Sequence, residues 1–305
     1  MALSTPPRTA WAFAPAHLTG IFAPSLDAPD PRGRGSTGAG LVLDAGVHAG
    51  VVWRPSQRHA VRFRADVTGP LPISRDVARR LAALRPGALQ LTLRHDLPIG
   101  QGFGMSAAGA LATGLATASA LGISRQQAIE TAHLADLYGG GGLGGVSAIL
   151  GGGLEVRERP GVPPWGKVRH IGCAGSVFLI VAGGPLPSPR LLRNPTFLRR
   201  VHAASAPGLA RLGTRPTLGR FLEEAQRFTD ALRIGPEGVL RRVQQLRSAE
   251  VSVAQSMFGR SLFAVPRTAR ARTELQRKLE ATHVSAVEVS ISTHGAFARS
   301  RAQRL

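Results

Sequence analysis

A glycine-rich segment near residue 100 carries the clearest chemical signal in the chain. It contains Pro98, the alternating glycines Gly100, Gly102 and Gly104, and then Ser106, Ala107 and Ala108. Alternating glycines let the backbone turn tightly and approach a ligand closely. The first amides of a following helix would point outward with the positive end of its dipole, which suits a phosphate group. The segment therefore predicts a phosphate-binding loop in which Ser106 contacts phosphate or magnesium; a glycine-rich turn without a ligand is the alternative.

Three further side chains could take part in chemistry. His133 and Asp136 are three residues apart in a helical pattern, so they share one helix face, opposite a stripe of small alanines. On residue types alone, a solvated polar face is the simpler interpretation of that pair. Arg157 follows a short glycine run, and its planar guanidinium suits a bidentate grip on a carboxylate, although a single arginine is ordinarily a surface residue.

The elements that must position these residues follow from hydrophobic spacing. Residues 89–93 alternate leucine with polar residues, which indicates a half-buried strand. Residues 74–84 show an apolar stripe at helical spacing, and residues 106–121 are rich in alanine, a strong helix former. Residues 124–138 begin with Ser124 in capping-box spacing. The glycine-rich segment thus lies between a strand and a helix.

The second half of the chain also alternates helices and strands. The expected strands are 177–182 and 287–291, and the expected helices are 217–233 and 268–282. Both halves therefore indicate an α+β protein.

Gly/Pro-rich stretches divide the chain. One of them, residues 24–40, is expected to form turns, and another, residues 160–166, is the most plausible domain boundary. We therefore expect an N-terminal domain at 1–160 and a C-terminal domain at 161–305.

The composition excludes several classes of protein. The two lysines, Lys167 and Lys278, do not complete a Gly-Lys-Ser/Thr motif, so the chain is not a Walker-type P-loop enzyme. The single cysteine, Cys173, excludes an intrachain disulfide and a multi-cysteine zinc site.

The charge balance is strongly basic: 38 basic and 18 acidic residues give a net charge of +20. A surplus of this size can attract nucleic acid or an anionic membrane. The basic residues are nevertheless scattered and the aromatic rings are few, so we expect no specific nucleic-acid partner. The best apolar run, residues 176–183, is strand-sized, so we expect no membrane span and a cytoplasmic protein. Whether the chain forms a homodimer stays open.

The glycine-rich segment resembles the ATP-binding motif of the GHMP kinases, the superfamily of galactokinase, homoserine kinase, mevalonate kinase and phosphomevalonate kinase. Four other segments resemble the archaeal pantoate kinases within that superfamily. They are residues 12–22, 35–41, 132–136 and 252–259. The likeness extends from about residue 11 to residue 298, nearly the whole chain.

The resemblance implies a GHMP kinase fold. Its N-terminal domain would be similar to the second domain of ribosomal protein S5, and its C-terminal domain would be ferredoxin-like. ATP would lie with its triphosphate on Gly100–Ala108. Its γ-phosphoryl group would pass to pantoate, giving 4-phosphopantoate on the archaeal route to coenzyme A.

The resemblance also implies roles for the other candidates. Asp136 falls where the family has its magnesium-binding carboxylate, usually a glutamate, and would hold Mg²⁺ together with Ser106. His133 would help to hold the substrate. Arg157 falls where these kinases have an arginine for pantoate.

One residue departs from the family pattern. The archaeal enzymes typically read Gly-Thr-Gly-Leu-Gly-Asp after this helix, with the aspartate as the presumed base, whereas residues 140–145 read Gly-Gly-Gly-Leu-Gly-Gly. Gly145 has no side chain, and we expect it to lie at positive φ. A general base is typically worth about 10²–10⁴ in rate, but phosphoryl transfer depends mainly on positioning and charge. A GHMP-fold kinase for another small hydroxy acid or alcohol, and a catalytically silent nucleotide-binding protein, therefore stay open as alternatives.

Overall fold

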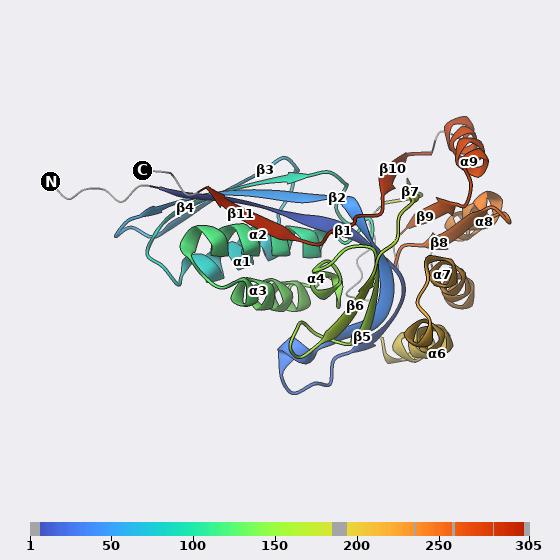
Figure 1. Ribbon diagram of the computed structural model, residues 1–305, viewed down its shortest axis with the longest axis horizontal. Coiled ribbons are helices and arrows are strands. Elements are labelled where there is room, and N and C mark those ends of the chain that lie inside the picture. The colour runs from blue at the N-terminus through green and yellow to red at the C-terminus, as the bar shows by residue number, and fades with distance from the viewer. Residues whose placement is uncertain (1–6, 185–193, 235, 258–259, 283, 302–305) are drawn as a thin grey trace.

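The protein is an α+β structure built on two sheets (Figure 1). The computed structural model describes residues 7–184, 194–234, 236–257, 260–282 and 284–301. Seven strands form the first sheet, in the order β11-β1-β2-β4-β3, with β5 paired to β2 and β6 paired to β5. These strands are β1 (Arg8–Ser25), β2 (Gly35–Pro55), β3 (Ala60–Ala65), β4 (Gly87–His95), β5 (Leu154–Arg159), β6 (Lys167–Ile171) and β11 (Phe297–Arg301).

The two longest strands, β1 and β2, form one antiparallel hairpin. Their pairing extends from Ser25 opposite Gly35 to Arg8 opposite Trp53, and the short 3-10 helix η1 (Pro31–Gly33) lies in the connection. The expectation that residues 24–40 form turns was therefore wrong for residues 24–25 and 35–40, which belong to the strands, and holds only for the connection at 26–34. The strand glycines Gly35, Gly38 and Gly40 lie where neighbouring backbone or side chains come close, rather than in tight turns.

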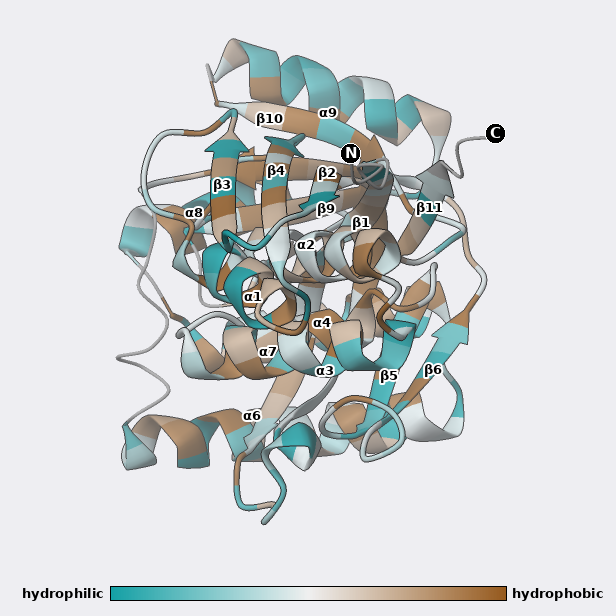
Figure 2. Ribbon diagram, turned by 90° about the vertical axis from the view of Figure 1, so that its left-hand side faces the viewer, coloured by the Kyte–Doolittle hydropathy of each residue, from teal (hydrophilic) through white to brown (hydrophobic). Residues whose placement is uncertain are grey.

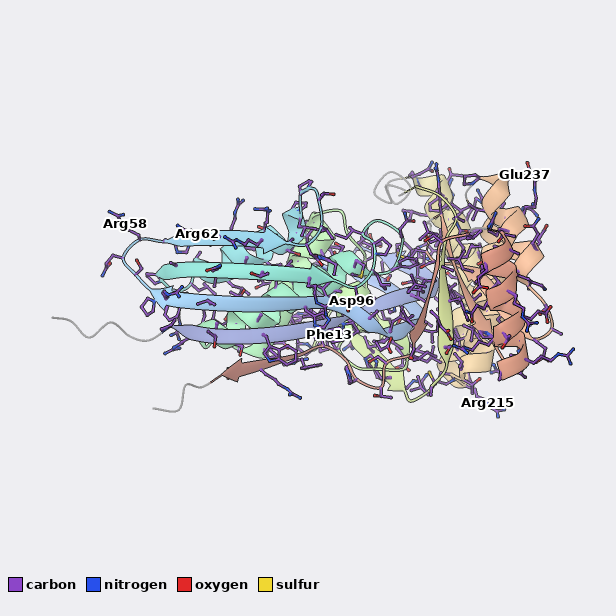
Figure 3. All side chains as sticks on the ribbon, turned by 90° about the horizontal axis from the view of Figure 1, so that it is seen from above. Phe13, Arg58, Arg62, Asp96, Arg215 and Glu237 are labelled. Carbon is purple, nitrogen blue, oxygen red and sulfur yellow. The ribbon has the colours of Figure 1, made fainter. Side chains whose placement is uncertain are left out.

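Helices cover one face of the first sheet. They are α1 (Pro72–Ala82), α2 (Met105–Leu121), α3 (Arg125–Tyr138) and the short α4 (Gly145–Ala148). In the view of Figure 2, α2 lies between the sheet and the outer helices, and nearly all of its residues are buried. Its alanines make this close packing feasible. Figure 3 shows the opposite face of the sheet, over which no described helix lies.

The second sheet has four strands in the order β10-β7-β9-β8. They are β7 (Ser176–Val181), β8 (Val251–Gln255), β9 (Ser261–Pro266) and β10 (Ala286–Ser290). Its helices are α6 (Pro195–Thr214), α7 (Leu218–Leu232), α8 (Glu237–Leu246) and α9 (Ala269–Ala281). Helices α8 and α9 bury an apolar core against one face of this sheet. Helix α7 contacts both β8 and β1, so it joins the second sheet to the first.

The structure confirms the expected elements to within about two residues at each end. The predicted helix at 106–121 is α2, and the predicted strand at 89–93 is the centre of β4. Ser124 caps α3 by accepting a hydrogen bond from the Gln127 amide. The division at residue 160 stays a prediction; β6, which follows it, and β11 both belong to the first sheet. None of the described helices is long and apolar enough to cross a bilayer.

Candidate active site

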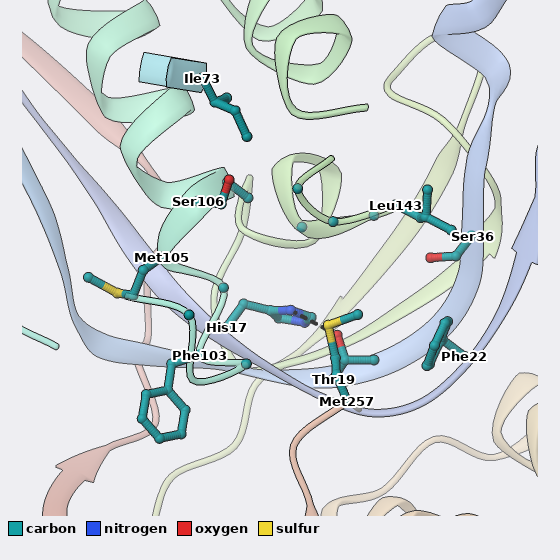
Figure 4. Close-up of a pocket in the computed structure, with 18 of the residues that line it drawn as sticks. His17, Thr19, Phe22, Ser36, Ile73, Phe103, Met105, Ser106, Leu143 and Met257 are labelled. Carbon is teal, nitrogen blue, oxygen red and sulfur yellow. Dashed lines mark hydrogen bonds between the residues drawn. The ribbon is translucent and has the colours of Figure 1, made fainter. Parts of the chain in front are cut away.

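A cavity of about 250 Å³ lies where the N-terminus of α2 faces the β1–β2 hairpin (Figure 4). Its wall contains five of the residues predicted for the phosphate loop. They are Gly100, Gly102, Gly104, Ser106 and Ala107. The glycine run at 140–145 and Arg157 also line it. The cavity therefore brings together, from three separate segments, most of the residues that the sequence singled out.

The loop between β4 and α2 needs its glycines. Gly100, Gly102 and Gly104 have φ values of 81°, 78° and 68°, which side-chain-bearing L-residues rarely adopt. A Cβ on Gly102 would lie 2.8 Å from the Ser256 carbonyl oxygen, and a Cβ on Gly104 would lie 3.0 Å from the backbone of His17. The loop is fixed from both sides, because the His17 amide donates to the Phe103 carbonyl and the Ser256 hydroxyl donates to the Gly102 carbonyl.

Two predicted members of the loop lie outside the cavity wall. Pro98 is exposed at the start of the loop. Ala108 is fully buried, and its amide donates to the Gly104 carbonyl inside α2. Gly104 has no side chain that could cap α2. The first backbone amides of α2, which form the positive end of its dipole, therefore receive no capping side-chain oxygen from it.

Asp136 and Ser106 form a buried polar pair. The Ser106 hydroxyl donates to Asp136 Oδ1 at 2.7 Å, and the Gly142 amide donates to Oδ2 at 3.1 Å. Asp136 is 2% exposed and lies behind the cavity wall, which Ser106 itself lines. Burial raises the pKa of Asp136 to about 6, even though both hydrogen bonds favour its ionised form. Among the described residues, no cationic side chain therefore offsets the cost of burying the Asp136 carboxylate.

The Asp136 carboxylate fits beside position 141 only because that residue is a glycine. A Cβ on Gly141 would collide with the Asp136 carboxylate and would lie 2.8 Å from the Ser106 hydroxyl oxygen. In the described residues, no three His, Cys, Asp or Glu side chains gather to hold a metal ion. A cation here would therefore take few protein ligands and complete its shell with phosphate oxygens, as Mg²⁺ usually does.

A chain of three charged or titratable groups forms the opposite side of the site. Glu155, on β5, is fully buried and binds two partners through Oε1: His17 Nε2 at 2.8 Å and the guanidinium of Arg157. Arg157 is 2% exposed and lines the cavity, and its buried Nε has no hydrogen-bond partner among the described residues. The surface-residue interpretation of Arg157 was therefore wrong.

His133 lies away from this group. It is 3% exposed, does not line the cavity, and its Nε2 has no hydrogen-bond partner among the described residues. Burial lowers its pKa, and backbone groups of Pro31 and Arg34 partly offset that effect. The solvated-face interpretation was wrong for both His133 and Asp136, because each is buried. The substrate role of His133 stays a prediction.

Gly145 lines the cavity as the first residue of α4. Its backbone is helical, so the expectation of a positive φ was wrong. What restricts this position is instead a neighbour: a Cβ on Gly145 would lie 2.6 Å from the Cβ of Ala107. Gly145 is therefore packed against the first turn of α2.

Residue patterns alone did not single out His17, Thr19 or Glu155. His17 and Thr19 lie between two irregularities in the β1–β2 pairing, at residues 15–17 and 19–21. Glu155 is 138 residues from His17, so no local spacing could join them. The one available signal was the segment at 12–22 on which the resemblance to the archaeal kinases partly rests.

Comparison with known proteins agrees with this geometry. Residues 73–153 match the family model of the GHMP kinases N terminal domain. A pantoate kinase from Thermococcus kodakarensis is 31% identical over 277 residues, covering 87% of this chain and 90% of the relative. The chain belongs to the pantoate kinase family of GHMP kinases. A pantoate kinase from Methanocaldococcus jannaschii is 25% identical over 83% of this chain and 91% of that relative.

Solved structures identify the fold in the same way. A protein described as a phosphotransferase related to the CoA biosynthesis pathway matches with a TM-score of 0.84 and 26% identity, covering 95% of this chain and 98% of the other. The fold is thus the α+β GHMP kinase fold that the resemblance implied. It brings the glycine-rich loop, Ser106 and Arg157 to the wall of one cavity, with Asp136 bonded to Ser106 behind that wall.

Proposed function

We propose that this protein transfers the γ-phosphoryl group of ATP to pantoate and forms 4-phosphopantoate. The observation that carries the proposal is a single cavity lined by a phosphate loop, the Ser106 hydroxyl and a buried arginine. The named activity of the relatives supports the substrate, and the CoA-related neighbour supports a place on the archaeal route to coenzyme A.

ATP would lie with its triphosphate against Gly100–Ala107. The backbone amides at the start of α2 would hold phosphate oxygens, and no lysine is needed for this. Because the loop is fixed by His17 and Ser256, these amides are held in place before ATP arrives. Such preorganisation is the main contribution that a protein makes to phosphoryl transfer.

Ser106 and Asp136 fit a magnesium ion. Asp136 is a buried carboxylate without a cationic partner in the described residues, and its raised pKa expresses that deficit. The space kept by Gly141 and the hydroxyl of Ser106 complete a site with few protein ligands. Ser106 and Asp136 would hold the Mg²⁺, which would supply positive charge to offset the charge that develops on the phosphate oxygens during transfer.

Arg157 would bind the acceptor. Pantoate is a small dihydroxy acid, and a guanidinium with a fixed orientation suits its carboxylate. Glu155 holds that orientation through an ion pair that water does not screen, since both side chains are at most 2% exposed. The carboxylate end would therefore be fixed while a hydroxyl group faces the phosphate loop. We also propose that His133, which is buried outside the cavity wall, helps to hold the substrate.

A second candidate function is a silent GHMP-fold protein that binds nucleotide without turnover. The glycine at position 145 favours it, because the family's presumed base is absent there. A kinase for another small hydroxy acid or alcohol would use the same phosphate loop and differ only in the acceptor that it binds.

One assay separates these functions. Purified protein is incubated with ATP, Mg²⁺ and a panel of hydroxy acids and alcohols, and ADP release is measured for each. We expect ADP release that depends on pantoate. Release with a different acceptor would replace the substrate, and binding of ATP without turnover on the whole panel would support the silent fold.

The remaining expectations concern partners and location. A cytoplasmic location, a homodimer and weak, salt-sensitive binding of nucleic acid all stay predictions. Size-exclusion chromatography with light scattering measures the oligomeric state, and titration of single-stranded and double-stranded DNA at several salt concentrations measures the last.

A further inference from the structure

Phosphoryl transfer from a hydroxyl group releases a proton, and Gly145 has no side chain to receive it. We propose that Thr19 and His17 form a proton relay that takes this proton in place of the missing carboxylate. The inference rests on the proposed kinase function, because it names the proton acceptor of the same site.

The cavity wall offers few acceptors. Among the described residues that line it, the titratable side chains are His17 and Arg157, and an arginine remains protonated. Asp136 lies behind the wall, and each of its oxygens already accepts a hydrogen bond. Among the described lining residues, His17 is therefore the side chain with a site that can accept a proton.

Glu155 fixes the tautomer of His17. Burial opposes ionisation of Glu155, but the charge of Arg157 and the hydrogen bond from His17 together outweigh it, so the pKa of Glu155 lies below its ordinary value. An ionised carboxylate only accepts hydrogen bonds, so His17 Nε2, at 2.8 Å, carries the hydrogen. Nδ1 is then left with a free lone pair.

Thr19 connects that lone pair to the cavity. Its hydroxyl oxygen is 3.3 Å from His17 Nδ1, so in this tautomer the hydroxyl donates to Nδ1 (Figure 4). Thr19 is 6% exposed and His17 is 2% exposed, and both line the cavity. The irregularities in strand pairing on either side of them, at residues 15–17 and 19–21, are the kind of feature that redirects side chains near active sites.

The protonation state of His17 suits a proton acceptor. Burial lowers its pKa below the ordinary 6.5, against the raising effect of Glu155. The other charged or titratable groups that face it are Arg157 on β5 and His170 on β6, and both lower its pKa further. The phosphate loop packed against it contributes only Phe103 and Gly104 here. His17 is thus neutral at pH 7.

The step balances as follows. The acceptor oxygen attacks the γ-phosphorus, the bond from that phosphorus to the β,γ-bridging oxygen breaks, and ADP leaves with the bond's electrons. The acceptor's proton passes to the Thr19 oxygen while the Thr19 hydroxyl proton passes to His17 Nδ1. The resulting imidazolium lies beside the Glu155 carboxylate, which stabilises it, and the proton then returns to solvent. An oriented base activated by a third group is a recurring arrangement in catalysis.

The test compares Thr19→Val with Thr19→Ser. Valine keeps the shape of threonine and removes the hydroxyl, whereas serine keeps the hydroxyl and removes a methyl group. We expect the valine variant to lose roughly 10²-fold or more in kcat, the lower end of what a positioned acid or base contributes, and the serine variant to stay within a few-fold of wild type. The KM for ATP should be nearly unchanged in both.

A second variant keeps the test decisive if Thr19→Val folds poorly. In the wild-type protein, kcat should fall as the pH is lowered through the depressed pKa of His17, in addition to any fall caused by protonation of Asp136, whose pKa is about 6. His17→Gln should lower kcat and remove the His17 part of that acid limb, leaving only the part that Asp136 causes. His48→Gln, on the exposed face of β2, should keep both the rate and the limb.

The outcomes separate the relay from the kinase function. Turnover of pantoate by the wild type, with equal rates for Thr19→Val and Thr19→Ser, overturns the relay and leaves the kinase function intact. If another acceptor is turned over, the same pair of variants tests the relay with that acceptor. Absence of turnover with every acceptor overturns both.

Discussion

Replacing Gly145 with aspartate should weaken ATP binding unless Ala107 is also replaced. In Gly145→Asp the new Cβ would lie 2.6 Å from the Cβ of Ala107, whereas carbon atoms pack best at about 3.5–4.0 Å. Either α4 or the first turn of α2 must therefore move by about 1 Å. Because Ala107 directly follows Ser106, that movement displaces the phosphate loop.

The magnitude follows from the cost of overpacking. Forcing an extra group into a packed site typically costs about 1–3 kcal/mol. If the free protein relieves the strain by shifting the loop, ATP must restore the loop when it binds. The affinity for ATP should then fall by roughly 5- to 150-fold, since each 1.4 kcal/mol is a factor of about ten.

The double variant Gly145→Asp/Ala107→Gly should restore most of that affinity. Removing the Ala107 methyl group opens the space, at the cost of about 1 kcal/mol for a glycine in a helix. In the Thr19→Val background, the carboxylate at position 145 should also restore part of the lost kcat.

Calorimetric titration with a non-hydrolysable ATP analogue and Mg²⁺ measures these affinities. Gly219→Asp is a matched control, because Gly219 also lies in the first turn of a helix and an added Cβ there meets nothing within 4 Å. Wild-type affinity in Gly145→Asp, or no recovery in the double variant, would refute the reasoning.

Three further predictions concern the cavity. Gly102→Val should weaken ATP binding in the same titration, because φ is 78° and its Cβ would lie 2.8 Å from the Ser256 carbonyl; unchanged affinity would contradict the loop assignment. Folding raises the pKa of Asp136 from 3.8 to about 6, so the folded protein binds the carboxyl proton of Asp136 more tightly than the unfolded chain does. The free energy of unfolding should therefore fall by about 3 kcal/mol as the pH rises from about 4 to 6. Thermal unfolding across that range should show the loss in the wild type, and an equal loss in Asp136→Asn would contradict it. Arg157→Lys should raise the KM for pantoate roughly 10-fold or more and leave the KM for ATP nearly unchanged, because all the donors of lysine lie on one nitrogen and cannot reproduce the planar guanidinium, whose separate nitrogens can bind Glu155 and a second carboxylate together. Equal KM values for pantoate would remove Arg157 from the acceptor site.

Features that depend on neighbouring residues could be predicted from the sequence. A glycine-rich turn before a helix follows from the alternating glycines and the alanines after them, and both the positive φ values and α2 confirm that geometry, whereas phosphate binding by the loop stays a prediction. The starts of α3 and α9 could be predicted equally well, because Ser124 and Thr268 cap these helices with their own side chains.

Features that depend on distant residues could not. The glycines of β2 resembled turn residues, but Gly38 and Gly40 lie where a Cβ would collide with Arg157 and His17. The need for glycine at these positions follows only from the pairing of β5 with β2, which places Glu155 opposite Gly40. The burial of Asp136 and the contact between Gly145 and Ala107 likewise arise from the packing of α2 against α3 and α4.

The central claim is that one cavity carries out phosphoryl transfer from ATP to pantoate. Phosphorus-31 NMR of a reaction containing the wild-type protein, ATP, Mg²⁺ and pantoate tests it most directly, because it observes the new phosphate ester as well as the loss of ATP. We expect a phosphomonoester on the 4-hydroxyl group of pantoate, formed in step with ADP. Formation of ADP with inorganic phosphate alone, or the absence of any new phosphate ester while ATP is bound, would contradict the account.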